Sequence, residues 1–460
     1  MNKFFRNTVT FALLGAVLLG ITVLVSDHVD SVEGEVHNYL LEAYGYEFVE
    51  NYNLAFEMAT ELYDQLPVDR MGGVVYPDHF GGMYINDEGK LVILELVEDG
   101  AFDGFEDAVF KPAEFSYNEL IATMDFLDWA IAGVEPNASA WYLDVINNRV
   151  VVELINYGSA EIAAFQDTVL DSPMIAFEQG EETALVSGQF AEGQSQGIQS
   201  LICRNVPQPR PPAVNLPTIP NTRVNIRTGD RIWVFRNGLG WIDGGFLSIG
   251  YRAQAANGEI GFVTAAHVDM PRGMQVGDII ANNSGVRIGE VRQARLHGID
   301  AAFVAIGANV AMSSHTNLAA AGNYNLINLP GQRVIIHGGT SGTHVGTIIF
   351  PHLTYFIGRT TIYSAMRTTN TVNSGDSGSV VYTIGSNGNV TGTVGIVNSG
   401  AGIPCLNIPM PYTVVSRAGA INRAFNLRIV HGGQATPSTP PPPIPGIPGV
   451  PGIPPIPPRP

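Results

Sequence analysis

The C-terminal part of the chain contains no lysine and few acids. Residues 201–460 carry 18 arginines and only eight acidic side chains, a net charge of +10. Residues 1–200 carry 34 acidic and six basic side chains, a net charge of −28, which leaves −18 for the whole chain. The arginines are scattered and no recognition motif accompanies them, which argues against nucleic acid as a partner. We expect instead an acidic N-terminal domain that docks on a basic C-terminal domain, because complementary charge favours association.

Cysteine is nearly absent, with only Cys203 and Cys405 in 460 residues. There is no Cys/His ligand cluster, no HExxH pair and no nucleotide-binding loop, so we expect neither a metal nor another cofactor. An exported protein can form disulfides. Cys203 and Cys405 either pair, tying a linker to the C-terminal domain, or remain two free thiols.

The first 26 residues resemble an export signal. Lys3 and Arg6 precede an apolar run over residues 9–25. A positive region followed by an apolar one is typical of a secretory signal peptide. The run is long for a signal and short for a membrane span. We therefore expect a signal cleaved near Ser26, with an uncleaved membrane anchor as the alternative.

Residues 30–190 form an acidic α+β unit in this interpretation. Helical spacing of apolar residues predicts helices over residues 36–66 and 119–131. Two hairpins are predicted, one at residues 82–94 with the turn NDEG and one at residues 141–154 with the turn NN. Alternating helices and hairpins make a small α+β domain.

The remainder of the chain divides into three segments. Residues 191–221 are rich in Gln, Gly, Asn and Pro and predict an exposed linker and processing zone. Residues 222–432 alternate short β-rich runs with Gly/Asn turns, as in an all-β barrel protein. Residues 433–460 are proline-rich and predict an extended polyproline II tail, either a passive spacer or a ligand for a cell-wall component or a Pro-binding domain.

The segment NSGDSGS at residues 373–379 is the strongest chemical signal. A serine attacks a carbonyl only when a base removes its proton and backbone N–H groups hold the oxyanion. The flanking glycines let the turn direct the N–H groups of Gly375 and Ser377 at one point. Gly, Ser and Asp also form ordinary turns, so this motif needs partners elsewhere.

Those partners occur in two apolar segments upstream. His267 ends the run GFVTAAH, and Asp300 opens the run DAAFV. A carboxylate in such surroundings needs a hydrogen-bond partner, and an imidazole N–H suits it. Each residue alone also fits a structural role. Their conjunction with Ser377 favours a catalytic set.

These segments resemble the chymotrypsin-like serine proteases, in the bacterial branch of streptogrisins and alpha-lytic protease. TAAH, GIDAAFV and GDSGS match the surroundings of that family's His, Asp and Ser, and TSGTHVG and VNSGA match two further stretches. The resemblance covers residues 222–432 and implies two antiparallel β-barrels. It implies that His267 is the general base, Asp300 orients it, Ser377 is the nucleophile, and Gly375 and Ser377 form the oxyanion hole.

The same resemblance extends to the acidic domain. WYLDVINNRVVVEL and GGMYINDEGKLVIL are similar to the family's pro-region, which assists folding of the protease and then inhibits it. Residues 30–190 are thus expected to be a pro-domain, and residues 222–432 a secreted endopeptidase acting on proteins or peptides and made as an auto-processed precursor. The alternative is an inactive protease-like protein that binds a surface.

The resemblance also places a specificity pocket. Its base is expected near Thr371, and Ser399, Gly400 and Ala401 are expected to contact substrate, with Ser399 near Asp300 and its backbone paired to the substrate. An acid is missing at Thr371, which disfavours cleavage after Lys or Arg. We expect an apolar or small neutral side chain on the acyl side of the scissile bond.

The family usually pairs the aspartate before the nucleophile, here Asp376, with an arginine. No arginine stands at the matching stretch of this sequence, which reads IHG. His337 is the hypothesised substitute.

Overall fold

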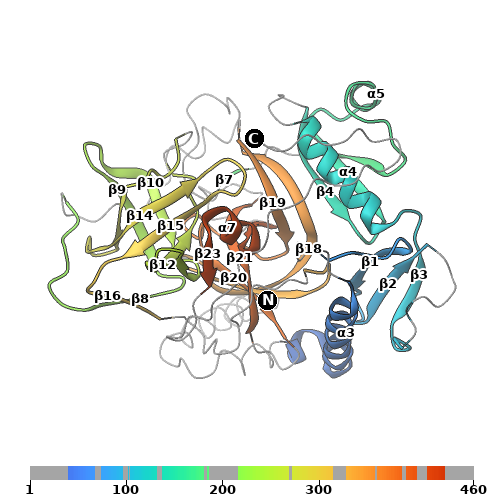
Figure 1. Ribbon diagram of the computed structural model, residues 1–460, viewed down its shortest axis with the longest axis horizontal. Coiled ribbons are helices and arrows are strands. Elements are labelled where there is room, and N and C mark those ends of the chain that lie inside the picture. Colours follow the sequence, from blue (N-terminus) through green and yellow to red (C-terminus); the bar gives the residue numbers. More distant parts are fainter. Residues whose placement is uncertain are drawn as a thin grey trace, which may run out of the picture.

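The computed structural model describes residues 40–67, 74–96, 102, 104–131, 137–180, 184–185, 216–268, 272–313, 328–357, 360–385, 390–400 and 412–429. Within these ranges a small α+β region is followed by a much larger β region (Figure 1). The all-β domain preceded by a small α+β domain, expected from the sequence, is confirmed, and the α+β domain is called the pro-domain below after the resemblance of its sequence. Cys203, Cys405 and Ala401 lie outside the described residues.

The pro-domain contains two small sheets with helices packed against them. Its elements are α3 (Tyr46–Gln65), β1 (Phe80–Ile85), β2 (Leu91–Glu95), β3 (Val109–Pro112), α4 (Tyr117–Ala130), β4 (Ala138–Asp144), β5 (Arg149–Leu154), α5 (Ser159–Thr168), β6 (Ile175–Gln179) and β7 (Ala184–Leu185). Both predicted hairpins are confirmed, as β1–β2 and β4–β5. Helix α4 begins with a capping box in which Ser116 and Glu119 satisfy each other's backbone N–H groups.

The first barrel sheet surrounds one aliphatic core. Its strands, in spatial order, are β10 (Gly240–Ser248), β9 (Arg231–Arg236), β13 (Ile279–Asn282), β14 (Arg287–Arg295), β15 (Ala301–Ile306), β12 (Ile260–Thr264), β11 (Arg252–Ala255) and β23 (Leu427–Ile429). A separate parallel pair joins β8 (Val224–Arg227) to β16 (Val310–Ser313). Alternate residues of these strands point inward, among them Val234, Phe262 and Val304, all fully buried.

The second barrel closes on itself. Six strands follow one another as β17 (Arg333–Gly338), β20 (Val380–Ile384), β21 (Val390–Gly400), β22 (Thr413–Arg417), β19 (Thr360–Thr368) and β18 (Gly342–Ile357), and β18 pairs again with β17. Val-rich inward positions fill its core. Helix α7 (Ala418–Phe425) leaves this barrel and leads into β23 of the first one.

The pro-domain extends the second barrel by strand addition. Strand β4 pairs antiparallel with β18, so β4, β5 and β6 continue the sheet beyond the barrel (Figure 1). The hairpin β18–β19 therefore has the barrel at one end and the pro-domain at the other. An exposed strand edge offers unpaired main-chain groups, and a partner that pairs with them gains affinity from backbone hydrogen bonds.

Side chains reinforce this joint. Glu153 of β5 forms an ion pair with Arg367 of β19, with oxygen–nitrogen distances of 2.7 and 3.3 Å. The Arg367 guanidinium also lies over the rings of Tyr142, Phe350 and Tyr412. Both members of the pair are mostly buried, with 9% and 12% of their side chains exposed. The acidic pro-domain thus supplies a carboxylate to an arginine of the basic domain.

Candidate active site

Strand pairing brings His267 and Asp300 together. His267 lies just after β12, and Asp300 lies immediately before β15. These strands are antiparallel neighbours, with Thr264 opposite Ala302, so the end of one lies beside the start of the other. Asp300 has a positive φ of 39°, a conformation that Asp tolerates better than most residues. The turn directs its carboxylate into the interior, where its side chain is fully buried.

A chain of hydrogen bonds connects the three residues. His267 Nδ1 lies 2.5 Å from Asp300 Oδ2, and His267 Nε2 lies 2.8 Å from Ser377 Oγ. The other carboxylate oxygen of Asp300 accepts the N–H of Ala266 at 2.9 Å. Because both oxygens are engaged, the buried carboxylate is compensated and the imidazole is fixed in orientation. A neutral ring that donates from Nδ1 presents an acceptor at Nε2 to the serine hydroxyl.

Two glycines allow the turn that carries Ser377. Gly375 and Gly378 have φ values of 98° and 84°. A Cβ at Gly375 would lie 2.6 Å from both the Phe246 ring and Thr340 Oγ1. A Cβ at Gly378 would lie 2.1 Å from Thr264 Oγ1. Both positions therefore require glycine for its backbone conformation and for space.

Strand β10 of the first barrel holds this turn in place. Ser248 donates its hydroxyl to the Gly375 carbonyl at 2.7 Å, and its N–H to the Ser377 carbonyl at 2.8 Å. With both carbonyls engaged, the orientations of the Gly375–Asp376 and Ser377–Gly378 peptides are fixed. The N–H groups of Gly375 and Ser377 donate to no acceptor within the described ranges. The turn thus leaves two donors available beside the serine hydroxyl, as an oxyanion hole requires.

Backbone amides satisfy the buried Asp376. Its carboxylate accepts N–H bonds from Thr340 at 2.8 Å, Ser341 at 3.1 Å and Asn373 at 2.8 Å. The Nδ1 atom of His337, the residue hypothesised as its partner, lies 2.7 Å from Thr343 Oγ1. Three N–H donors compensate a buried carboxylate without an arginine. The nucleophile loop is thereby bonded to the turn between β17 and β18.

The Ser399 hydroxyl contacts the hydroxyl of a tyrosine. Its hydroxyl donates to the Tyr355 hydroxyl at 3.4 Å and not to Asp300. Burial, followed by the charge of Asp300, raises the pKa of Tyr355. The Ser399–Tyr355 contact was indicated by no sequence motif. The expectation that Ser399 is a hydrogen-bond partner near Asp300 stays a prediction.

The expected pocket residues lie around one end of the second barrel. Thr371 is half-buried in the segment between β19 and the nucleophile loop, and Gly400 ends β21, opposite Thr413. Asn398 is buried and donates to Ser416 Oγ at 2.8 Å. No acidic side chain appears among these residues. The described ranges contain no group of three metal-ligating side chains and no helix able to span a membrane.

The pro-domain reaches the active-site end of this barrel through β7. The two-residue strand pairs antiparallel with β21, placing Leu185 opposite Ser399 and Ala184 opposite Gly400. Strand β21 also borders the nucleophile loop, because Gly378 donates to Val397 and Val397 donates to Ser379, at 2.7 and 2.8 Å. A strand of the pro-domain thus pairs with β21, the strand with which the substrate was expected to pair.

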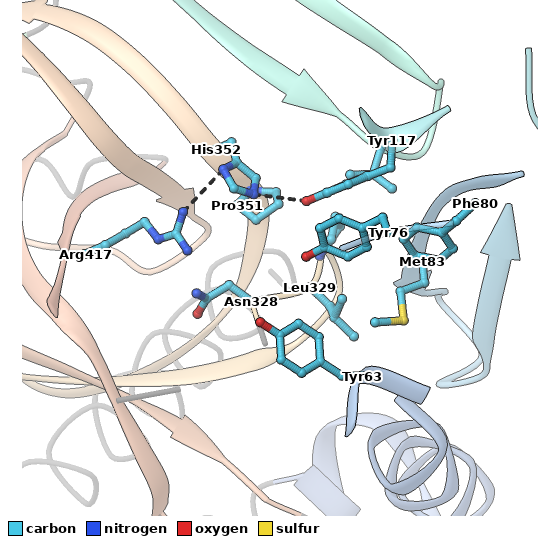
Figure 2. A pocket seen from close by; sticks show the side chains of 12 residues that line it. Tyr63, Tyr76, Phe80, Met83, Tyr117, Asn328, Leu329, Pro351, His352 and Arg417 are labelled. Carbon is cyan, nitrogen blue, oxygen red and sulfur yellow. Dashed lines mark hydrogen bonds between the residues drawn. The ribbon is translucent and has the colours of Figure 1, made fainter. Parts of the chain in front are cut away.

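A second pro-domain contact borders a partly open pocket of about 120 Å³. Figure 2 shows Tyr63, Tyr76 and Tyr117 of the pro-domain facing Asn328, His352 and Arg417 of the protease-like domain. His352 Nε2 lies 3.0 Å from the Tyr117 hydroxyl, and its Nδ1 lies 3.3 Å from Arg417. Burial, with the charge of Arg417 second, lowers the pKa of His352 to about 3.

Comparisons with known proteins agree with the resemblance of the acidic domain. Residues 48–114 match the family model of the Pro-like N-terminal domain, and residues 118–180 match that of the Pro-like C-terminal domain. No curated protein matches the chain.

Three solved structures illustrate what the chain is similar to. Thermobifida fusca protease A is 22% identical, with 45% of this chain and 100% of that chain covered and a TM-score of 0.36. Nocardiopsis protease is 26% identical, with 45% and 99% covered and a TM-score of 0.34. Cellulomonas bogoriensis chymotrypsin is 25% identical, with 45% and 100% covered and a TM-score of 0.35.

Proposed function

Residues 48–114 and 118–180 are Pro-like domains of the kind found in the pro-regions of alpha-lytic-type proteases, and from this premise we propose that the chain is the precursor of a serine endopeptidase. Ser377 is its nucleophile, His267 its general base and Asp300 the orienting carboxylate. The unbroken hydrogen-bond chain from Asp300 through His267 to Ser377 is the observation that carries the proposal.

The reaction proceeds through an acyl-enzyme. Ser377 Oγ attacks the substrate carbonyl while His267 Nε2 takes its proton. The N–H groups of Gly375 and Ser377 stabilise the oxyanion, which is worth about 3–4 kcal/mol per donor in comparable sites. The imidazolium then protonates the leaving amine. A water molecule, deprotonated by His267, hydrolyses the ester and regenerates Ser377.

The pocket selects a neutral side chain in this proposal. Thr371, Ser399, Gly400 and Ala401 contact the substrate residue on the acyl side, and no acid is available among them to bind Lys or Arg. An apolar or small neutral residue is expected there. Selectivity is broad, because one methylene of fit in such a pocket changes the barrier by only about 1–3 kcal/mol.

The pro-domain is proposed to assist folding and to inhibit the folded enzyme. Its strand β4 extends the sheet at β18, and β7 lies along β21, where substrate would pair. We further propose that residues 1–26 direct export, that the enzyme works outside the cell, and that the proline-rich tail associates with the cell surface.

Labelling with a fluorophosphonate tests the activity. The reagent forms a covalent bond only with a serine whose base and oxyanion hole are assembled. We expect mass spectrometry to find it on Ser377 of processed protein, and Ser377→Ala and His267→Ala to remove the label. A processed, folded protein that takes up no label at Ser377 would instead support the inactive surface-binding alternative.

A further inference from the structure

The pocket between the pro-domain and the second barrel contains a cation, and the residues that line it provide no counter-charge. Arg417, the last residue of β22, is half-buried there, and within the described ranges its guanidinium bonds only to His352, at 3.3 Å. None of the twelve lining residues is acidic. Burial lowers the pKa of Arg417, and the charge of Arg423 lowers it further. A cation in such a position is costly unless an opposite charge is brought to it.

Three phenols of the pro-domain surround the same space and keep their protons. Figure 2 shows the hydroxyls of Tyr63, Tyr76 and Tyr117 directed toward the space beside the Arg417 guanidinium. Burial raises the pKa of all three, so each hydroxyl remains a donor. Within the described ranges, the hydroxyls of Tyr63 and Tyr76 make no hydrogen bond.

The tautomer of His352 leaves the third hydroxyl available as well. A guanidinium only donates, so the Nδ1 atom of His352, which faces Arg417, is the acceptor of this pair. Burial lowers the pKa of His352 to about 3, so the ring is neutral and carries its one proton on Nε2. Nε2 therefore donates to the Tyr117 oxygen at 3.0 Å. The Tyr117 hydroxyl keeps its own hydrogen for a further acceptor.

We propose that this pocket binds a small aliphatic carboxylate, such as acetate or propionate. The planar fork of Arg417 matches the two oxygens of a carboxylate, and the three phenols supply further donors. The one negative charge of the ligand balances the one positive charge of the lining. Because the donors come from both domains, the complete site exists only while the pro-domain is docked. This inference goes beyond the proposed function and does not use the chemistry of Ser377.

The size and lining of the pocket select this class of anion. Its volume of about 120 Å³ equals that of about four water molecules at about 30 Å³ each, which suits a ligand of four or five heavy atoms. Phosphate carries more negative charge near neutral pH and has no apolar part. The remaining lining residues suit a methyl or ethyl group, since most of them are apolar: Phe80, Met83, Val145, Leu329, Pro330 and Pro351.

Asn328 also lacks a partner that such a ligand supplies. Its Oδ1 atom is buried and accepts no hydrogen bond within the described ranges. A half-turn of the amide exchanges this oxygen for Nδ2, which can donate to a carboxylate oxygen. The ligand thus satisfies a polar side chain that the protein's own contacts leave unsatisfied.

Met83 reports binding in the uncut chain, because it lines the pocket. Full-length Ser377→Ala protein is labelled with ¹³C at the methionine methyl groups, and Met83→Leu identifies the signal. At pH 7.5 and constant ionic strength, acetate should shift the Met83 signal saturably, with half-saturation at about 1 mM, as expected of so small a ligand. The signal of Met366, buried in the core of the second barrel, should not move. A Met83 signal unchanged up to about 50 mM acetate would overturn the proposal.

Matched substitutions test the cation and the phenols. Arg417→Gln removes the charge and should abolish the saturable shift. Arg333→Gln should keep it, because Arg333 is another interface cation, bonded to the Tyr44 hydroxyl at 2.9 Å and outside the pocket lining. Equal binding by the two variants contradicts the proposal. Tyr76→Phe removes one donor and should raise the half-saturating concentration about 2–10-fold. This variant decides the matter if Arg417→Gln does not fold, and an unchanged concentration then rejects the site.

Other anions test the class of ligand. Propionate should compete with acetate at a similar concentration, whereas chloride and phosphate should need at least about tenfold more. If chloride or phosphate binds as tightly as acetate, the pocket holds a nonspecific counter-ion and the carboxylate assignment is wrong.

A ligand held by both domains must also tighten their complex. After an added protease has cut the linker of the Ser377→Ala chain, acetate at ten times its half-saturating concentration should lower the dissociation constant of the pro-domain about tenfold. Arg417→Gln should lose this effect. An unchanged dissociation constant would show that one domain alone binds the ligand, which contradicts the proposed site. A chain without protease activity would still bind acetate, so these outcomes are independent of the proposed function.

Discussion

Asp300 and Glu153 are both buried carboxylates that bond to a nitrogen-containing side chain. They differ in whether that side chain belongs to the same domain as the carboxylate. Asp300 bonds to His267 and to the N–H of Ala266, all within the first barrel. Glu153 belongs to the pro-domain and its partner Arg367 to the second barrel. The hydrogen bonds of Asp300 therefore need no group from the pro-domain, whereas Arg367 has its carboxylate only while the pro-domain is bound.

The largest effect is expected from changing Asp300, the carboxylate whose partners lie in its own barrel. Asp300→Asn keeps the shape, but the amide can donate to Nδ1 and so favours the tautomer whose Nε2 carries the proton. That ring cannot accept from Ser377. We expect kcat to fall about 10⁴-fold, the loss known for this substitution in a Ser-His-Asp triad.

Turnover of a neutral peptide substrate by processed enzyme measures this loss. The affinity for the pro-domain should not change, because the carboxylate lies outside that interface. A loss of less than about tenfold would show that Asp300 does not orient the base.

Changing Glu153, the carboxylate at the domain interface, should have a smaller effect, and that effect should be on dissociation of the pro-domain and not on turnover. Glu153→Gln leaves the Arg367 charge buried without its partner, a change that costs about 3–5 kcal/mol in comparable pairs. The cut pro-domain should then dissociate about 10²–10³-fold more readily. The turnover of separated protease should stay the same, because Glu153 belongs to the pro-domain and the protease itself is unchanged.

Dissociation of the processed complex on dilution, followed by gel filtration, measures this effect. Glu114→Gln is the matched control. Glu114 pairs with Arg149 inside the pro-domain, and 59% of its side chain is exposed. Exposed pairs contribute about 0–1 kcal/mol, so the control should change dissociation little. Equal behaviour of the two variants would mean that the Glu153–Arg367 pair does not hold the domains together.

Local patterns explain which parts of the molecule the sequence predicts. The NDEG and NN turns fix both pro-domain hairpins, since turn residues set the backbone conformation on their own. His267, Asp300 and Ser377 were recognisable because each sits in a distinctive short motif. Their roles remain proposals, but the structure joins them by hydrogen bonds.

The contacts between domains could not be predicted in this way. Pairing of β4 with β18 uses main-chain groups that any sequence supplies, so no residue pattern marks it. The two-residue strand β7 is too short to give a period. Tyr355 was missed for a related reason: it lies 44 residues from Ser399, in a strand whose apolar pattern indicates only burial.

The smallest expected effect concerns the second interface cation, Arg417, which has no carboxylate within ion-pair distance in the described ranges. It lies beside His352, which also faces Tyr117, with Tyr63 and Tyr76 across the pocket (Figure 2). A proton on Nδ1 of His352 would point at the guanidinium. The complex therefore binds the neutral ring, whose pKa is lowered from 6.5 to about 3.

Acid should for this reason loosen the pro-domain. When the pro-domain leaves, water reaches His352 and its pKa rises toward 6.5, so the free protease takes up a proton that the complex excludes. Above this value the affinity is unaffected. Below it the dissociation constant should rise with falling pH, by up to about tenfold per pH unit, until pH nears 3.

Gel filtration of the cut complex between pH 7.5 and 4.5 measures this dependence without relying on turnover, in which His267 also titrates. His352→Gln is the matched variant, because an amide can bond to both Tyr117 and Arg417 but takes up no proton. Its dissociation constant should equal that of the wild type at pH 7.5. Below pH 6.5 it should rise less steeply with falling pH than that of the wild type. If the dissociation constants of wild type and His352→Gln changed with pH in parallel, a group other than His352 would cause the acid response. Of the two interface cations, Arg367 and Arg417, only Arg367 would then have a partner that controls release of the pro-domain.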